Sequence, residues 1–140
     1  MNADTPPPTL GLRHLALFVP DPLFDATIRF YREGMAMAID WQPDPDNVYL
    51  SSGADNLALH RAAADRSVEL ATSPLDHLGF CVADAEAVER WHQRLSAGAS
   101  QWKLGKIGET RRHRDDSTSF YFRDPAGHQV QIIHIPSLRA

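Results

Sequence analysis

The sequence predicts an α+β fold: two tandem βαβββ modules whose mixed sheets form a cup around a central cavity. The first observation behind this prediction is an internal repeat, in which GLRHLALFVPD at residues 11–21 aligns with PLDHLGFCVAD at residues 74–84. The alignment has an offset of 63 residues and places His14 on His77. The second observation is that one helix-like and three strand-like segments follow each copy, so two repeated units account for nearly the whole chain.

The first unit begins with a segment, residues 11–19, in which Leu15, Leu17 and Val19 alternate with other side chains. This alternation indicates a strand with two different faces. Residues 23–33 carry apolar side chains at helical spacing, and Gly34 follows them, which favours a helix that ends there. Three further strands are expected at about residues 36–42, 46–52 and 55–61, because turn-forming Pro, Asp and Gly residues separate them.

The second unit repeats this order. Its spacing predicts a strand at 75–83, a helix at 85–97 and strands at about 106–113, 117–123 and 128–135. The chain therefore divides into an extended tail at 1–10, a first module at 11–61, a linker at 62–74 and a second module at 75–136. Either module alone would expose an apolar sheet face, so we expect the two to pack together.

The composition excludes several classes of function. The chain has 140 residues, 43% of them hydrophobic, and a formal net charge of −4, so it has no general basic field to hold nucleic acid or anionic lipid. No apolar run approaches the length that a bilayer requires. The N-terminus lacks the features of a signal peptide and Cys81 is the single cysteine, so we expect a cytoplasmic protein without disulfides.

Side-chain alternation places four polar residues on the cavity face of the sheets. If the helices cover the faces rich in Leu and Val, His14 and His77 in the first strands point to the opposite face. The same parity brings His60 and Gln131, in the fourth strands of the two modules, to that face. Imidazole nitrogens and an amide oxygen are suitable ligands for a divalent transition metal. The residues therefore favour a metal site in which His14 and His77 bind the ion and Gln131 or His60 completes its coordination sphere.

Further side chains are expected to line the pocket, namely Phe18, Ala58, Cys81 and Gln129. We interpret Cys81 as a small buried thiol, because a nucleophilic role would need a partner base. The charged run from Arg111 to Arg114 is either a solvated loop or a clamp at the pocket rim for an anionic substrate.

Three other histidines are expected outside the cavity. His128 follows Gly127 in a turn and should be exposed, and His92 should lie on the surface of the second helix. His134 has the opposite parity to Gln131 and should face away from the cavity.

Three segments together resemble one known family: RHLALFVPD with FYREGM, DHLGFCVAD, and FYFRDPAGHQVQIIHIP. The chain resembles the vicinal oxygen chelate superfamily, the glyoxalase/bleomycin resistance/extradiol dioxygenase group, over about residues 11–136. The resemblance implies a cup around one divalent metal (Fe, Zn, Ni, Co or Mn), with ligand positions at His14 and His77. The other two positions map to Ala58 and Gln131, where the family usually has a carboxylate, so the chain departs from the pattern twice.

Two hypotheses follow. The first is a metal-dependent enzyme of dioxygenase, lyase or isomerase type, in which the metal chelates vicinal oxygens of a small substrate. His14, His77 and Gln131 would then hold the metal, and His60 would be the catalytic base. The second is a metal-free small-molecule binding protein of bleomycin-resistance type, which the missing carboxylates favour. The resemblance also implies a homodimer.

Overall fold

The computed structural model describes residues 5–63 and 73–138, so most of the expected linker lies outside the described residues. The first half forms a four-stranded sheet, here called sheet A, with strand order β1-β4-β3-β2. Strands β1 and β4 are parallel, and the other two pairs are antiparallel. The strands are β1 (His14–Val19), β2 (Ala38–Asp44), β3 (Asn47–Ser51) and β4 (Asn56–Arg61).

The second half forms sheet B, with the equivalent order β5-β8-β7-β6 and a parallel β5–β8 pair. Its elements are β5 (Leu78–Cys81), α2 (Ala85–Gly98), β6 (Arg111–Arg112), β7 (Thr118–Arg123) and β8 (Gln129–His134). The expected α+β class with tandem modules and mixed sheets is therefore confirmed. Strand β6 is shorter than expected, because Gly105 and Gly108 reach β7 only through single backbone hydrogen bonds of 3.0 and 2.8 Å.

The single helix expected in the first half consists of three consecutive segments. A 3₁₀ turn, η1 (Asp21–Leu23), leads into the helix α1 (Phe24–Arg29) and then into a π-helical turn, η2 (Phe30–Gly34). The π turn buries the neighbouring side chains Phe30 and Tyr31 completely. Gly34 is required at its end, because a Cβ there would lie 2.7 Å from the Phe30 ring.

Helix α2 follows the predicted boundaries closely. Asp84 caps its N-terminus by accepting a 2.7 Å hydrogen bond from the Ala87 backbone N–H. Val88 and Leu95 are fully buried and face the sheet, and α2 packs on β7 and β8. The helix ends at Gly98, where the Trp102 ring occupies the space that a Cβ would need.

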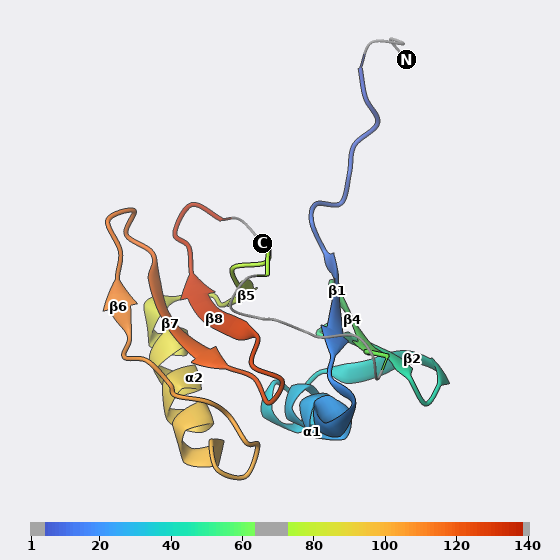
Figure 1. Cartoon of the computed structure of the whole chain (residues 1–140). Coiled ribbons are helices and arrows are strands. Elements are labelled where there is room, and N and C mark those ends of the chain that lie inside the picture. Colours follow the sequence, from blue (N-terminus) through green and yellow to red (C-terminus); the bar gives the residue numbers. More distant parts are fainter. Residues whose placement is uncertain (1–4, 64–72, 139–140) are drawn as a thin grey trace.

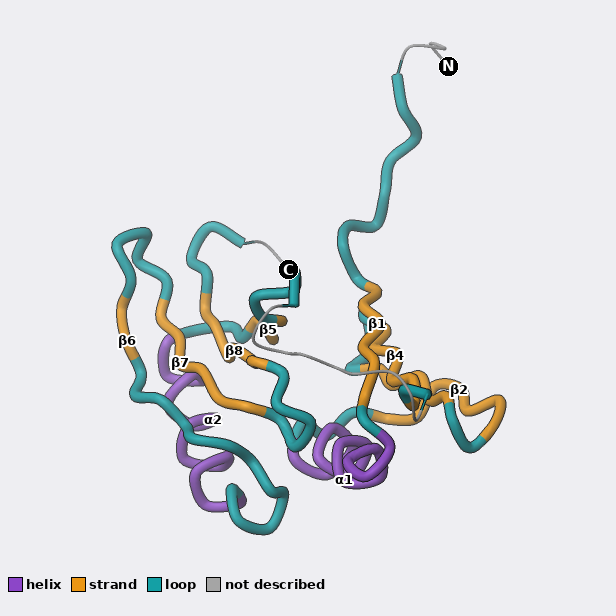
Figure 2. The backbone as a smooth tube through the Cα atoms, in the orientation of Figure 1, coloured by secondary structure: helices purple, strands orange, loops and turns teal. Residues whose placement is uncertain are grey.

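Both sheets pack their apolar faces against one shared core (Figure 1). Leu17 and Leu59 of sheet A, Phe122 and Ile132 of sheet B, and Phe30 belong to the same buried cluster. Figure 2 shows α1 near the junction of the halves and α2 beside β7 and β8. The opposite face of each sheet therefore points away from this core, and those faces carry the candidate site residues.

A buried polar cluster joins the two halves. The hydroxyl of Tyr31 donates a 2.8 Å hydrogen bond to Asp124, which lies in the turn between β7 and β8. The backbone N–H of His128 donates to the same carboxylate at 2.9 Å, and His128 Nδ1 lies 3.0 Å from it. Burial, reinforced by the Asp124 charge, raises the pKa of Tyr31 well above its usual value. The prediction that His128 is exposed is wrong. The residue is 6% exposed and contacts the Asp124 carboxylate through its backbone N–H and its ring.

The prediction that His92 lies on the surface is also wrong. Its ring is half-buried, packs edge-on against Phe120 and places Nε2 3.0 Å from the carbonyl oxygen of Gly108. Over the ranges that the structure describes, no helix is long and apolar enough to cross a membrane.

Candidate metal and substrate site

A cleft lies between the two edge strands β1 and β5. Its volume is about 540 Å³, within the range of small-molecule sites. Residues from both repeats line it, among them His14 and Asn56 from sheet A, and His77, Gly79 and Cys81 from the second half. Cys81 is exposed there, so the expectation of a buried thiol is wrong.

The hydrogen bonds of His14 determine which of its ring nitrogens is available. Nδ1 lies 2.8 Å from the side-chain oxygen of Asn56, and the amide nitrogen of Asn56 donates to Asp40 at 3.4 Å. Because the Asn56 oxygen can only accept, His14 Nδ1 must carry the proton. The Nε2 lone pair of this exposed histidine is then free for another ligand.

His77 has the same arrangement in the second repeat. It precedes β5, and its Nδ1 lies 2.6 Å from the carboxylate of Asp76, which can only accept. The ring also packs edge-on against Tyr121, with ring centroids 5.3 Å apart. An Nδ1–H group bonded to a side-chain oxygen, with a free Nε2, is the usual state of a metal-binding histidine.

Gln131 lies on the outer face of sheet B, beside Gly79 on β5 and Tyr121 on β7. It is 6% exposed, and its amide nitrogen donates a 2.9 Å hydrogen bond to the hydroxyl of Ser119. Its oxygen lies on the other side, since a Cβ on Gly79 would be 3.8 Å from it. Gln131 therefore presents an amide oxygen toward the strand that follows His77. Gln129 lies two residues earlier on the same face and is half-buried.

The equivalent position in sheet A contains no ligand group. Ala58 is 1% exposed and lies between Ala16 on β1 and Tyr49 on β3. The two sheets thus differ at the position where the family resemblance implies a carboxylate.

The structure places His60 apart from His14. His60 pairs with Phe18 on β1 and Asn47 on β3, and its Nδ1 lies 2.6 Å from the Asn47 oxygen. His14 lies four residues before Phe18 on the same strand, a separation of roughly 13 Å at about 3.3 Å per residue. The rings of Phe18, Tyr49 and His60 form an aromatic group on this face, and Phe18 is 41% exposed.

Sequence reasoning missed the part that β6 and β7 play in the site. The register places Arg111 beside Ser119, so both lie on the face of Gln131. His113 Nε2 lies 2.6 Å from the Ser119 hydroxyl. The alternation of Ser119 and Tyr121 with buried phenylalanines could have revealed this face, but the pairing partner of Arg111 is not visible in sequence.

The donor set is unusual for a metal centre. Among the residues with described positions, no group of three or more His, Cys, Asp or Glu side chains could hold a metal ion. Two imidazoles and an amide oxygen are nevertheless compatible with a divalent ion whose other positions are taken by substrate or water oxygens. Because this set is neutral, it would hold such an ion less firmly than a set that includes a carboxylate.

Comparison with known proteins identifies the family. A profile of the Glyoxalase/Bleomycin resistance protein/Dioxygenase superfamily matches residues 11–132. The chain belongs to this superfamily. It is 32% identical over 133 residues to the glutathione transferase FosA of Serratia marcescens, covering 93% of this chain and 84% of that protein.

Solved structures share its fold. A lactoylglutathione lyase from Agrobacterium tumefaciens is 25% identical, with a TM-score of 0.67 over 91% of this chain and 96% of that one. An integron cassette protein from the Halifax Harbour sewage outfall is 19% identical, with a TM-score of 0.71 over 90% of this chain and 99% of that one.

Proposed function

We propose that this protein is a divalent-metal-dependent enzyme that transfers a thiol such as glutathione to a small, oxygen-bearing electrophile. The observation that carries the proposal is that His14 and His77 have the same hydrogen bonding at Nδ1. Both line one cleft, and each has its Nδ1 bonded to a side-chain oxygen, so that Nε2 is free. The names of two relatives, a glutathione transferase and a lactoylglutathione lyase, favour glutathione as a reactant.

The chemistry of Gln131 favours transfer over isomerisation. His14, His77 and the Gln131 oxygen would hold the ion, whose contribution when bound is to polarise a substrate oxygen. An isomerase also needs a base beside the metal, and an amide cannot accept a proton. In the transfer, the thiolate would form a C–S bond as a C–O bond of the electrophile breaks, and the released oxygen would take a proton from water. This step requires charge stabilisation but no base at residue 131. The cytoplasm, where thiols stay reduced, suits both this reaction and the exposed Cys81.

The outer face of sheet B favours an anionic reactant. Arg111 lies on this face beside Ser119, and its side chain forms no hydrogen bond or ion pair with the residues that the structure describes. A guanidinium recognises carboxylates through paired hydrogen bonds, and glutathione carries two of them at neutral pH. We therefore assign Arg111 to substrate binding.

A catalytic role for His60 is a separate proposal. Its Nδ1 is held by Asn47, so Nε2 is available as a base on the outer face of sheet A. His60 pairs with Phe18, which lies roughly 13 Å along β1 from His14. His60 would therefore act on a different part of a long substrate. His60→Ala should retain metal and lose turnover, and unchanged turnover would exclude the role.

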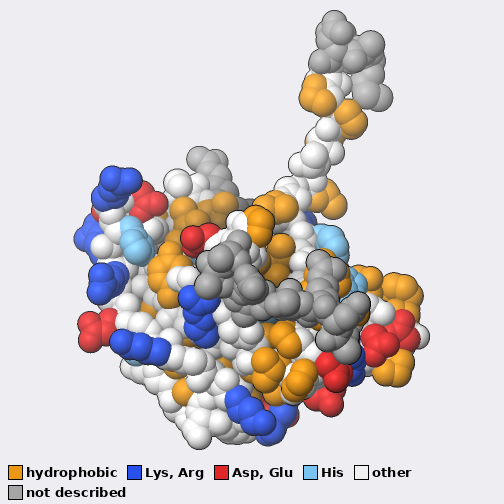
Figure 3. All heavy atoms as spheres, viewed as in Figure 1, with side chains coloured by type: hydrophobic (Ala, Val, Ile, Leu, Met, Phe, Trp, Pro, Cys, Tyr) orange, Lys and Arg blue, Asp and Glu red, His pale blue; other side chains and the backbone are white. Residues whose placement is uncertain are grey.

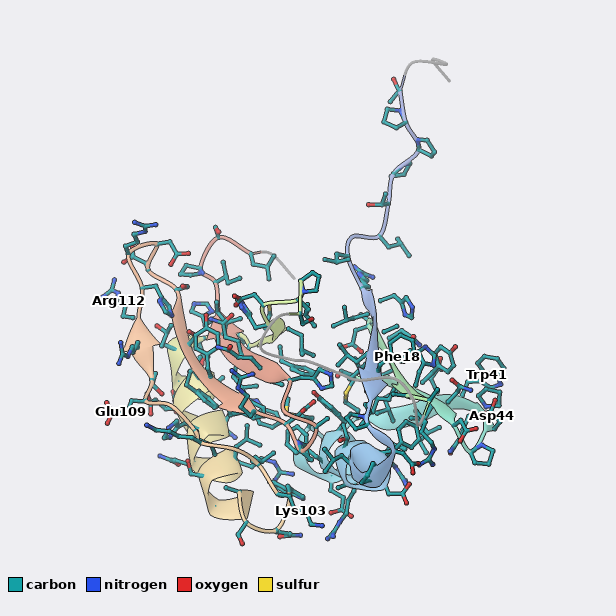
Figure 4. The ribbon with its side chains drawn as sticks, in the orientation of Figure 1. Phe18, Trp41, Asp44, Lys103, Glu109 and Arg112 are labelled. Atoms are coloured by element: carbon teal, nitrogen blue, oxygen red, sulfur yellow. The ribbon has the colours of Figure 1, made fainter. Side chains whose placement is uncertain are left out.

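A second copy of the chain is the partner that these faces fit. Trp41 and Phe18, on the outer face of sheet A, are 58% and 41% exposed. Figure 4 shows Trp41 and Asp44 at the opposite side of the molecule from Arg112. Lys and Arg side chains gather near β6, whereas Asp and Glu side chains gather near the β2–β3 hairpin (Figure 3). We propose a homodimer in which sheet A of each protomer faces sheet B of its partner.

Metal analysis of protein purified without chelator tests the proposal. The wild type should carry one divalent ion per chain, and His14→Ala with His77→Ala should reduce it to background. His92→Ala is the matched control, because its ring bonds to a backbone carbonyl away from the cleft. The proposal fails if the double variant retains as much metal as the wild type.

The second hypothesis, a metal-free binding protein, has one observation in its favour. The neutral Gln131 stands where the family resemblance implies a carboxylate, and the buried Ala58 stands at the equivalent position of sheet A. This alternative predicts binding of a small molecule that is unaffected by chelator or by His77→Ala.

A further inference from the structure

The side chain of Gln131 has two ends of equal size and opposite character. The oxygen end accepts hydrogen bonds or binds a cation, and the nitrogen end donates hydrogen bonds and repels a cation. Nothing in the glutamine itself decides which end faces Gly79. The neighbours of the amide must therefore decide it.

Those neighbours form a chain of two short hydrogen bonds. The Gln131 nitrogen lies 2.9 Å from the Ser119 hydroxyl oxygen, and this oxygen lies 2.6 Å from His113 Nε2. Ser119 is 1% exposed and Gln131 is 6% exposed, so water does not compete freely for either side chain. The three side chains come from β7, β8 and the segment after β6, which places them side by side on sheet B.

With His113 Nε2 unprotonated, the proton of the Ser119 hydroxyl fixes the amide. A serine hydroxyl has one proton to donate and lone pairs with which to accept. If it donates that proton to His113 Nε2, only acceptor capacity remains toward Gln131, and the amide must turn its nitrogen to Ser119. The oxygen of Gln131 then points the other way, as observed beside Gly79.

We propose that Ser119 and His113 are positioning residues that hold the Gln131 amide with its oxygen toward Gly79, which lines the cleft. This inference rests on the proposed metal site, because the fixed oxygen is the end that a divalent cation requires. A carboxylate has two equivalent oxygens and would not need such a device.

Cobalt(II) titration followed by visible absorbance tests this role. Ser119→Ala should weaken cobalt binding about tenfold, the effect typical of losing an outer-shell partner, and Ser119→Thr should restore it. Ser117→Ala is the matched control, because Ser117 is also a buried serine and lies directly before β7, but its hydroxyl bonds to Asp115. Its cobalt affinity should equal that of the wild type.

A double-mutant comparison separates positioning from general support of the fold. In a Gln131→Glu background, Ser119→Ala should cost less than twofold in cobalt affinity, because either carboxylate oxygen can face the ion. An equal loss in both backgrounds would overturn the positioning role while leaving the metal site intact. Absence of cobalt binding by the wild type would overturn the metal site and the positioning role together.

Discussion

Sheets A and B share one strand order but differ on the faces that they turn away from the core. Sheet A presents Phe18, Trp41 and a buried Ala58, whereas sheet B presents Gln131 within a network of polar side chains. Both sheets contribute equivalent apolar positions to a single core. The comparison teaches that the repeat preserves backbone pairing and core packing, while the polar network around Gln131 has no counterpart at Ala58 in the first half.

The largest expected effect is on the contact that joins the halves. Asp124→Ala should lower the free energy of unfolding by about 3–5 kcal/mol, because it leaves the buried Tyr31 hydroxyl and His128 without their acceptor. Urea denaturation measures this. Asp25→Ala, at an exposed carboxylate on α1, is the control and should change stability by less than about 0.5 kcal/mol. Similar losses in both variants would mean that the cluster does not hold the halves together.

An intermediate effect is expected from giving each sheet the same carboxylate. Gln131→Glu should raise cobalt affinity about tenfold or more, since a negative ligand would replace a neutral one in the proposed site with His14 and His77. Ala58→Glu should instead destabilise the fold without tighter cobalt binding, because Ala58 is 1% exposed between its neighbours. Isothermal titration calorimetry and thermal melting measure the two outcomes. Equal gains in affinity from both substitutions would remove the proposed asymmetry between the sheets.

The smallest effect is expected from the charges on the two faces. Asp44→Arg should weaken self-association a few-fold, because exposed ion pairs contribute little individually. Combining it with Arg111→Asp should restore association, since Arg111 lies on the outer face of sheet B and each protomer would then carry the reversed pair. Sedimentation velocity over a concentration series measures both changes. A wild type that sediments as a monomer at all concentrations would exclude the proposed dimer.

The sequence was sufficient for the fold because its signals are local. The repeated strand motif, the helical spacing of residues 23–33 and the turn residues each depend on neighbours within one element. Strand parity also placed Gly79 and Gln131 on one face, as the β5–β8 register has them, whereas His77 precedes β5. These are properties of periodicity, which a single sequence reveals.

The parts that the sequence did not reveal depend on distant pairs. His128 is buried because Asp124 also accepts from Tyr31, which is 93 residues away in the chain. The link from Ser119 to Gln131 depends on the β7–β8 register, and the position of Arg111 depends on an irregular approach to a two-residue strand. Alternation defines a face but not which side chains meet across it.

The π-helical turn Phe30–Gly34 has a consequence for how the chain tolerates changes in length. Its wider spacing allows the adjacent rings of Phe30 and Tyr31 to be buried together. A π turn holds one residue more than an α-helical turn, so deleting one residue there would restore α-helical spacing and leave the following segment in register. Loss of Tyr31 itself would remove the donor to Asp124. The segment between α1 and β2, from which Met35 and Met37 reach the cleft, can therefore lose one residue more readily than a plain helix can, whereas the identity of Tyr31 is constrained.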